Sequence, residues 1–183
     1  MASHSVEEEL LDVVDVDDNV VRRASRGEIH RRGWLHRAVH LFVFNSAGEV
    51  YVQRRSSSKD RFPQLLDSSA AGHVDPGESY ENAALRELGE ELGIEAKLQE
   101  VFRVSASDIT DNEHVVLYRV ETDAQPVPDP EEIQWGGFMT PERLTSRMKE
   151  TPGDFVPGFI YLWKEYLRVR ENEQVAEPGE HFL

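Results

Sequence analysis

Residues 72–94 read Gly-His-Val-Asp-Pro-Gly-Glu-Ser-Tyr-Glu-Asn-Ala-Ala-Leu-Arg-Glu-Leu-Gly-Glu-Glu-Leu-Gly-Ile, a glycine-containing loop followed by a predicted helix. Ser79 is a suitable N-cap, the pattern from there to Leu92 is helical, and Gly93 supplies the left-handed residue that ends a helix. One side of the predicted helix carries carboxylates spaced at i+3 and i+4, namely Glu87, Glu90 and Glu91. A separate apolar stripe can pack on a sheet and consists of Ala84, Leu85, Leu88 and Leu92.

Three carboxylates held side by side on a packed helix repel one another unless a positive charge lies among them. Mg²⁺ and Mn²⁺ prefer oxygen ligands and usually bind substrate phosphates as well. The competing interpretation is a solvated acidic helix face, which is the usual meaning of a charge run. The preceding loop favours the metal site, because Gly72 and Gly77 allow a tight turn whose carbonyl oxygens can face the helix. Arg86 adjoins Glu87 and precedes Glu90 by one helical turn, so it can orient carboxylates or meet a phosphate.

The rest of the chain predicts short strands mixed with few helices, which indicates a mixed sheet covered by helices in one domain. Strands are expected at 10–16, 38–44, 50–53, 101–104, 115–120 and 133–139. A turn at 17–19 leads into Val20 and Val21, the basic stretch 22–32 is a short helix or loop, and 45–48 is a hairpin turn. Thr140 and Pro141 open a short helix, and 155–169 is a terminal amphipathic helix. The predicted domain covers 1–170, with the hairpin 10–21 included, and 171–183 is a C-terminal tail.

Composition excludes several classes of function. The chain has 183 residues, and 20 Lys and Arg against 35 Asp and Glu give a formal charge of −15. A protein with this much negative charge repels nucleic-acid backbones and anionic lipid. We therefore expect neither a nucleic-acid polymer nor a membrane as a partner. The absence of cysteine excludes disulfides, thiolate zinc sites, iron–sulfur clusters and cysteine nucleophiles. The N-terminus lacks a secretory signal pattern and no apolar run can span a bilayer, so we expect a cytoplasmic protein.

The helical segment resembles the Nudix box, Gly-x5-Glu-x7-Arg-Glu-U-x-Glu-Glu-x-Gly-U with U aliphatic, at every defined position. The matching residues are Gly72, Glu78, Arg86, Glu87, Leu88, Glu90, Glu91, Gly93 and Ile94. This resemblance implies an α/β/α sandwich around a mixed sheet. It also implies metal-dependent hydrolysis of a nucleoside diphosphate linked to another moiety.

The same resemblance assigns roles to individual residues. Glu78 and Arg86 become a structural ion pair that braces the loop against the helix, supporting the site without touching substrate. Glu87 can also position the attacking water. No cofactor other than Mg²⁺ or Mn²⁺ is implied. The metal ligands are Glu87, Glu90 and Glu91, with a backbone carbonyl of Ala71 or Gly72 as an additional ligand.

Outside the box, several residues resemble type I isopentenyl-diphosphate isomerases and their hydrolase relatives. Residues 28–38 resemble the paired histidines ahead of the first core strand, and 53–59 the arginine and lysine that hold a diphosphate. By this resemblance Arg55, Lys59 and His73 contact the substrate diphosphate, and Glu113 is a catalytic base or a ligand of an additional metal. A separate metal site is implied at His30, His36, His73, Asp111 and Glu113. The plainer alternatives are ordinary loop and strand histidines and a basic surface turn.

One departure decides against the isomerase. That enzyme needs a cysteine immediately before the Gly-His of the box to move a proton, and this chain has Ala71 there. We therefore expect a Mg²⁺- or Mn²⁺-dependent Nudix pyrophosphohydrolase acting on a small diphosphate-containing substrate. An isomerase with a replacement proton donor and a catalytically silent nucleotide-binding sensor are the alternatives. The substrate stays open, because specificity lies in the loops at 22–37, 105–114 and 126–130. A homodimer is an expectation at family level alone.

Overall fold

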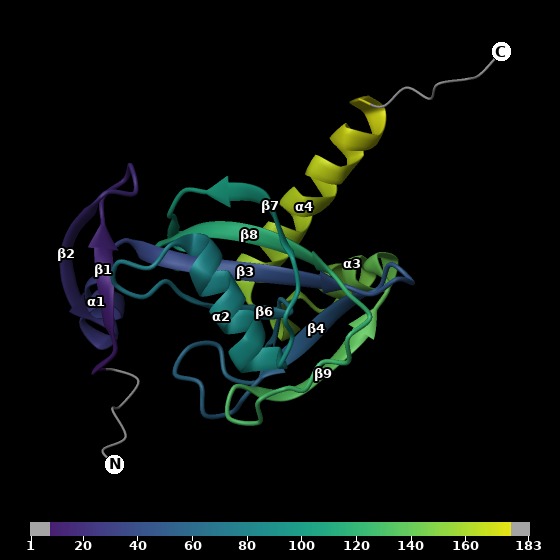
Figure 1. The fold of residues 1–183 in the computed structure, drawn as a ribbon, viewed down its shortest axis with the longest axis horizontal. Helices are drawn as coiled ribbons and strands as arrows, with labels where there is room; N and C mark the ends of the chain where they lie inside the picture. Colours follow the sequence, from purple (N-terminus) through teal and green to yellow (C-terminus); the bar gives the residue numbers. More distant parts are fainter. Residues whose placement is uncertain (1–7, 177–183) are drawn as a thin grey trace.

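The computed structural model describes residues 8–176. In chain order its elements are β1 (Leu10–Val14), β2 (Val20–Ser25), α1 (Arg26–Arg32), β3 (His36–Phe44), β4 (Val50–Arg55), β5 (Leu66–Asp67), β6 (Ala70–His73), α2 (Tyr80–Leu92), β7 (Leu98–Val104), η2 (Asp108–Thr110), β8 (Glu113–Glu121), β9 (Ile133–Met139), α3 (Pro141–Glu150), η3 (Pro152–Asp154) and α4 (Pro157–Ala176). Seven strands form one mixed sheet in the order β5-β4-β3-β8-β7, with β6 also paired to β3 and β9 to β4 (Figure 1). β3 and β8 run parallel, and the other pairs are antiparallel.

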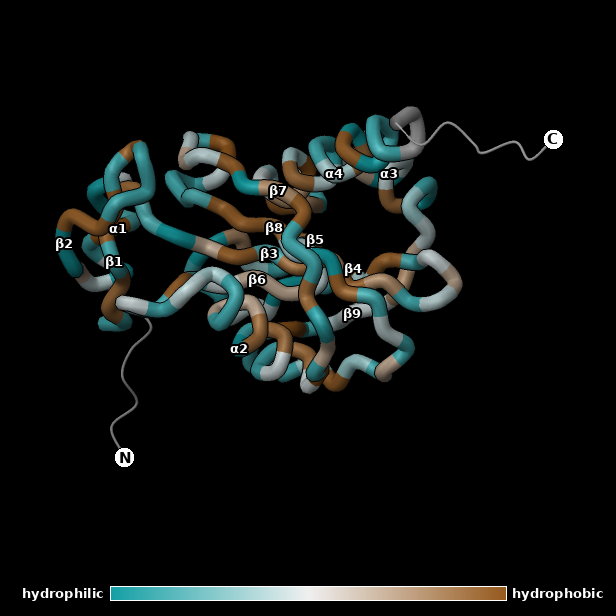
Figure 2. Tube along the Cα trace, turned by 45° about the horizontal axis from the view of Figure 1, so that its top comes forward, coloured by the Kyte–Doolittle hydropathy of each residue, from teal (hydrophilic) through white to brown (hydrophobic). Residues whose placement is uncertain are grey.

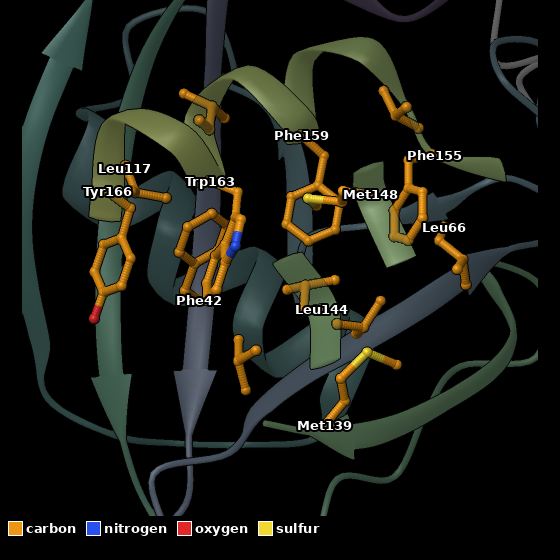
Figure 3. Packing of buried hydrophobic residues seen from close by; sticks show 14 of the residues in the cluster. Phe42, Leu66, Leu117, Met139, Leu144, Met148, Phe155, Phe159, Trp163 and Tyr166 are labelled. Carbon is orange, nitrogen blue, oxygen red and sulfur yellow. The ribbon is translucent and has the colours of Figure 1, made fainter. Parts of the chain in front are cut away.

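Helices cover both faces of this sheet, and the alternation of side chains along β3 fills a core on each face. On one face Phe42 packs against Phe159 and Trp163 of α4, with ring centroids 5.7 and 5.5 Å apart (Figure 3). On the other face Leu41 belongs to a second core together with Leu88 of α2. Figure 2 shows the apolar segments concentrated along the central strands β3 and β8. The predicted α/β/α sandwich around a mixed sheet is confirmed.

Helix α2 has the predicted bounds, because both of its ends are capped. The Ser79 hydroxyl accepts a hydrogen bond from the Asn82 amide at 3.2 Å, and Gly93 ends the helix at φ 64°, a conformation that glycine adopts without strain. The predicted apolar stripe was wrong at one position. Leu85 is 45% exposed, whereas Ala83 is fully buried. The helix is therefore rotated so that its buried stripe includes Ala83.

The N-terminal part forms a separate two-stranded sheet in which β1 pairs antiparallel with β2. The first strand ends at Val14, two residues earlier than predicted. The basic stretch 22–32 is neither wholly helix nor loop, because β2 continues to Ser25, whose hydroxyl caps α1. A small apolar cluster holds this part together and consists of Leu11, Val13, Ala24 and Ile29, with Trp34 against it.

Strand and helix ends account for the remaining differences. The short strands β5 and β6 were not predicted, since Ser68-Ser69 and the glycine-containing run after them carry no strand pattern. Helix α4 continues beyond Glu171 to Ala176, into the segment predicted as a C-terminal tail. Residues 177–183 and the start of the chain, on which the expectation about a secretory signal rests, lie outside the described range.

Between residues 8 and 176, no helix combines the length and apolar character needed to cross a membrane.

Candidate active site

A cavity of about 650 Å³ opens where β3 and β4 diverge and β6 inserts beside β3. β3 and β4 pair only at Phe44 and Val50, so beyond that pair the sheet is forked. Helix α2, the start of β8, the start of α4 and the loop after β4 close the cavity. The predicted site residues that line it are Arg55, Lys59, Ala71, Gly72, His73, Arg86, Glu87, Glu90, Glu91, His30, Asp111 and Glu113. His36 and Glu78 are not among the lining residues.

The three α2 carboxylates face this cavity at different depths. Glu91 is 3% exposed and accepts a hydrogen bond from the buried Gln53 amide at 2.9 Å. The side chain of Glu87 is 12% exposed and that of Glu90 is 63% exposed. Arg86 Nη1 joins the last two, lying 2.6 Å from Glu87 Oε1 and 3.3 Å from Glu90 Oε2. The carboxylates are therefore brought together, in a row that runs from the interior to solvent.

Their electrostatics indicate a deficit of positive charge. Burial, followed by the neighbouring charge of Glu87, raises the pKa of Glu91 to about 8. Burial also raises the pKa of Glu87, although the Arg86 guanidinium opposes the shift. A cation among these oxygens would oppose both shifts, because it stabilises the ionised carboxylates. The donor set, made of carboxylates beside a backbone edge, suits a hard divalent ion.

Strand β6 lies close against the carboxylates because Gly72 has no side chain. A Cβ at this position would overlap the carboxylate of Glu87. The backbone N–H of Ala71 lies 3.4 Å from Glu91 Oε2. The β6 backbone and the α2 carboxylates thus share one edge of the cavity, which is the arrangement that a carbonyl ligand from Ala71 or Gly72 requires.

Arg86 holds the loop of residues 74–79 against α2. Its Nε and Nη2 lie 3.2 and 3.0 Å from the two carboxylate oxygens of Glu78, and Nη2 also donates to the carbonyl of His73 at 3.0 Å. A guanidinium is suited to this bracing role, because its planar fork serves several acceptors at once. The contact with Glu78 has the geometry expected of the structural ion pair.

A second cluster, here called the histidine cluster, consists of His30, His36 and His73 from α1, β3 and β6. The ring centroids lie 5.0–5.5 Å apart, and one nitrogen of each ring lies within 4.8 Å of the others. Glu113 Oε1 lies 3.6 Å from His36 Nε2 and 3.4 Å from His73 Nε2. Asp111 Oδ2 lies 3.9 Å from His30 Nδ1. The five residues expected at a separate metal site therefore lie together.

Burial determines the charge state of the histidine cluster. Burial and the other two rings lower the pKa of His30 to about 4, and burial lowers the pKa of His73. For His36 burial lowers the pKa, but the nearby carboxylate of Glu113 outweighs it, so the pKa is raised. Burial opposes ionisation of Glu113, but His36 and His73 lower its pKa well below the ordinary range. Within residues 8–176, the Nε2 atoms of His30 and His36 are buried without a hydrogen-bond partner, as ligand nitrogens would be before an ion binds.

The two predicted diphosphate contacts also line the cavity, but each is paired with an acid. Arg55 Nη1 donates to Asp67 Oδ2 at 2.9 Å, and both side chains are largely buried. Lys59 forms an ion pair with Glu132. Burial lowers the pKa of Lys59, against the opposing charge of Glu91. These cations lie close enough to the α2 carboxylates for their charges to interact.

The polar residues of the cavity that were not predicted as site residues include Arg26, Arg61 and His40. Arg26 is 9% exposed and pairs with Asp60 at 2.8 Å, and Arg61 binds Asp111. No spacing within the basic stretch distinguishes Arg26 from its neighbours, so only the tertiary structure selects it. His40 is different, because a lone polar residue inside an apolar strand was visible in the sequence.

Comparison with known proteins agrees with this geometry. The NUDIX domain model matches residues 34–159, which is well over half of the chain, so the chain belongs to the Nudix family. An uncharacterised Nudix hydrolase of Streptomyces coelicolor is 35% identical over 94% of both chains. A protein named isopentenyl-diphosphate Delta-isomerase from Serratia proteamaculans is 34% identical over 92% of this chain and 97% of its own. A crystal structure of a Deinococcus radiodurans protein is 33% identical, has a TM-score of 0.75, and covers 86% of this chain and 98% of that one.

Membership of the Nudix hydrolase family supports a hydrolase, and Nudix enzymes generally use divalent metal ions and act on small substrates. The residues present fit such ions at two places. The α2 carboxylates offer oxygen ligands, and a bound cation would offset the burial that raises the pKa values of Glu87 and Glu91. The histidine cluster offers buried, unpartnered nitrogens beside an ionised carboxylate.

Proposed function

We propose that this protein is a Mg²⁺- or Mn²⁺-dependent hydrolase that cleaves the diphosphate bond of a small molecule. The observation that carries the proposal is the shared cavity, in which α2 carboxylates with raised pKa values face buried cations. Diphosphates resist hydrolysis because their negative charge repels nucleophiles, so a site that combines metal-binding acids with fixed cations suits this substrate.

In this proposal Glu87, Glu90 and Glu91 hold the metal, with a backbone carbonyl of Ala71 or Gly72. The bound ions supply neutralisation of the diphosphate oxygens, which lowers the barrier to attack by water. The surrounding side chains keep these ligands in place, because Gln53 fixes Glu91 and Arg86 orients the outer two carboxylates.

The cations of the cavity bind the substrate. Arg55 and Lys59 contact the diphosphate, with His73 at the mouth of the site. Both cations are held by acids, so they are presented in fixed positions without loss of charge. The cavity is large enough for a substrate of moderate size.

Glu113 serves as a ligand of the histidine cluster in this proposal, and not as a general base. Its two histidine partners keep its pKa well below the ordinary range, so it holds a proton weakly. A weakly basic carboxylate beside three imidazoles suits a second divalent ion.

The isomerase alternative lacks its proton donor. The position before Gly72-His73 is Ala71, whose methyl group neither gives nor takes a proton. The similarity to a protein named as an isomerase therefore supports a diphosphate-binding cavity and not alkene isomerisation in this chain.

The proposal is tested by a hydrolysis screen with Mg²⁺ or Mn²⁺ over nucleoside diphosphates, nucleotide sugars, dinucleotides and prenyl diphosphates, with products separated by chromatography. Glu91→Gln should abolish turnover, whereas Glu95→Gln, an equal change of charge at an exposed position outside the cavity, should retain it. Retained turnover in Glu91→Gln, or no turnover of any compound by the unmodified protein, contradicts the proposal. Isopentenyl diphosphate incubated with the protein should yield no dimethylallyl isomer, as followed by NMR.

A further inference from the structure

His40 is a polar residue in the buried central strand β3. It lies in β3, between Val39 and Leu41, and is 8% exposed. By the alternation of a strand its side chain shares a face with Ala38 and Phe42. Phe42 is in the core, whereas Ala38 and His40 line the cavity. The imidazole therefore lies at the boundary where the core ends and the cavity begins.

A buried hydrogen-bond chain fixes the orientation of this ring. His40 Nδ1 lies 2.8 Å from the hydroxyl of Ser68, which is fully buried. The Ser68 backbone N–H donates to Asp67 Oδ1 at 2.8 Å, and Asp67 Oδ2 accepts from Arg55 at 2.9 Å. The chain thus links the imidazole to a cation proposed to bind the diphosphate.

The other ring nitrogen faces the cavity. In the described part of the chain, His40 Nε2 has no hydrogen-bond partner, and it is not among the fully enclosed unpaired atoms. The Ser68 hydroxyl lies 2.8 Å from Nδ1, 3.3 Å from the Ala70 carbonyl and 3.5 Å from Asp67 Oδ1, and we assign its proton to the shortest of these contacts, the one to Nδ1. With Nδ1 accepting, the proton of the neutral ring is on Nε2. The ring therefore presents an N–H donor to the cavity.

The neighbouring strand leaves this donor uncovered. In the β3–β6 register His40 lies directly opposite Ala71, and side chains opposite each other share one face of the sheet. The N–H of Ala71 in turn lies 3.4 Å from Glu91 Oε2. Ala71 is therefore adjacent both to His40 on the neighbouring strand and to a carboxylate of α2.

We propose that His40 is a catalytic residue that donates a hydrogen bond from Nε2 to a phosphate oxygen of the bound diphosphate. The inference rests on the proposed function, because it takes the diphosphate to lie between the α2 carboxylates and Arg55. Ser68 acts through His40 as a positioning residue. No proton is transferred in this role, since the assigned tautomer already carries the donor on Nε2.

The test compares two substitutions that separate the two ring nitrogens. His40→Asn retains an amide near Nδ1, which keeps the contact with Ser68 but removes the donor from the cavity. His40→Gln places an amide nitrogen near Nε2 and restores the donor. His114→Asn is the matched control, because His114 is a buried histidine of β8 outside this cavity, bonded to the carbonyl of Asp15.

The probe is methylenediphosphonate with Mg²⁺, whose P–C–P bridge is not hydrolysed, and its affinity is measured by isothermal titration calorimetry. A hydrogen bond to a charged group predicts about a 10- to 100-fold loss of affinity in His40→Asn. His40→Gln and Ser68→Ala should each lose about 3- to 10-fold, because both remove the contact between Nδ1 and Ser68 but keep a donor in the cavity, and His114→Asn should stay within about threefold of the unmodified protein. Unchanged affinity in His40→Asn, with the unmodified protein binding the probe, overturns the role of His40 alone. No binding by the unmodified protein overturns the proposed function together with this inference.

A second measurement does not depend on the folding of any variant at position 40. In unmodified protein labelled with ¹⁵N, the imidazole nitrogens are observed by NMR through their long-range couplings to ring protons. Addition of the Mg²⁺ probe should shift the His40 Nε2 resonance and leave both nitrogens of His114 in place. A His40 Nε2 resonance that does not move at saturating probe overturns the proposal.

Discussion

Replacement of Glu91 by glutamine should stabilise the metal-free protein at alkaline pH. The carboxyl group is buried, and its pKa of about 8 lies far above the ordinary value of 4.5. Below pH 4.5 both the folded and the unfolded chain hold the proton. Between pH 4.5 and about 8 the unfolded chain ionises while the folded chain does not, so stability falls as the pH rises. Above pH 8 the penalty is constant.

The size of the effect follows from the difference between the two pKa values. At about 1.4 kcal/mol per pKa unit, ionised Glu91 costs the folded protein about 5 kcal/mol above pH 8. This is a large part of the ~5–15 kcal/mol by which a typical domain is stable. Glutamine has nearly the same shape, remains neutral, and can still accept the hydrogen bond that Gln53 donates to Glu91.

The assay is urea unfolding in EDTA at about pH 5 and pH 8.5, followed by circular dichroism. The free energy of unfolding of the unmodified protein should fall by several kcal/mol between these values, and that of Glu91→Gln should fall much less. Glu90→Gln is the matched control, because the Glu90 side chain is 63% exposed and water solvates its charge. If Glu91→Gln shows the same pH dependence as the unmodified protein, the reasoning about a buried, uncompensated carboxyl group is refuted.

Three further predictions concern neighbouring parts of the site. Gly72→Ala should displace the Glu87 carboxylate and weaken Mg²⁺ binding at least tenfold by calorimetry, and unchanged affinity would contradict the close approach of β6. Arg86→Ala should lower the free energy of unfolding by about 2–4 kcal/mol in urea, since it leaves part-buried acids and the His73 carbonyl without their donor. Arg86→Lys should recover only part of this loss, because an ammonium lacks the fork. Glu113→Gln should reduce Mn²⁺ or Zn²⁺ affinity of the histidine cluster at least tenfold at pH 7, measured with an indicator dye, and equal affinity would exclude Glu113 as a ligand.

Much of the fold was readable from the chain because its signals are local. The Ser79 cap, the Gly93 terminator and the apolar residues at helical spacing depend only on neighbours within a few positions, and α2 has the predicted bounds. β9 likewise matches the predicted 133–139. The positions that failed depend on distant partners. Leu85 lies at the edge of the helical stripe, and only contact with the sheet decides whether such a residue is covered.

The candidate site likewise has features that local sequence predicts and features that depend on contacts between distant segments. The sequence by itself determined the three carboxylates on one helix and the arginine beside them, because a helix places residues three and four apart on one side. The tertiary structure alone decided how deeply each carboxylate is buried, and hence that Glu91 carries the strongly raised pKa. It also gathered the histidine cluster from α1, β3 and β6, and placed His40 opposite Ala71. Strand register and burial arise from contacts between segments far apart in the chain, and no local pattern encodes them.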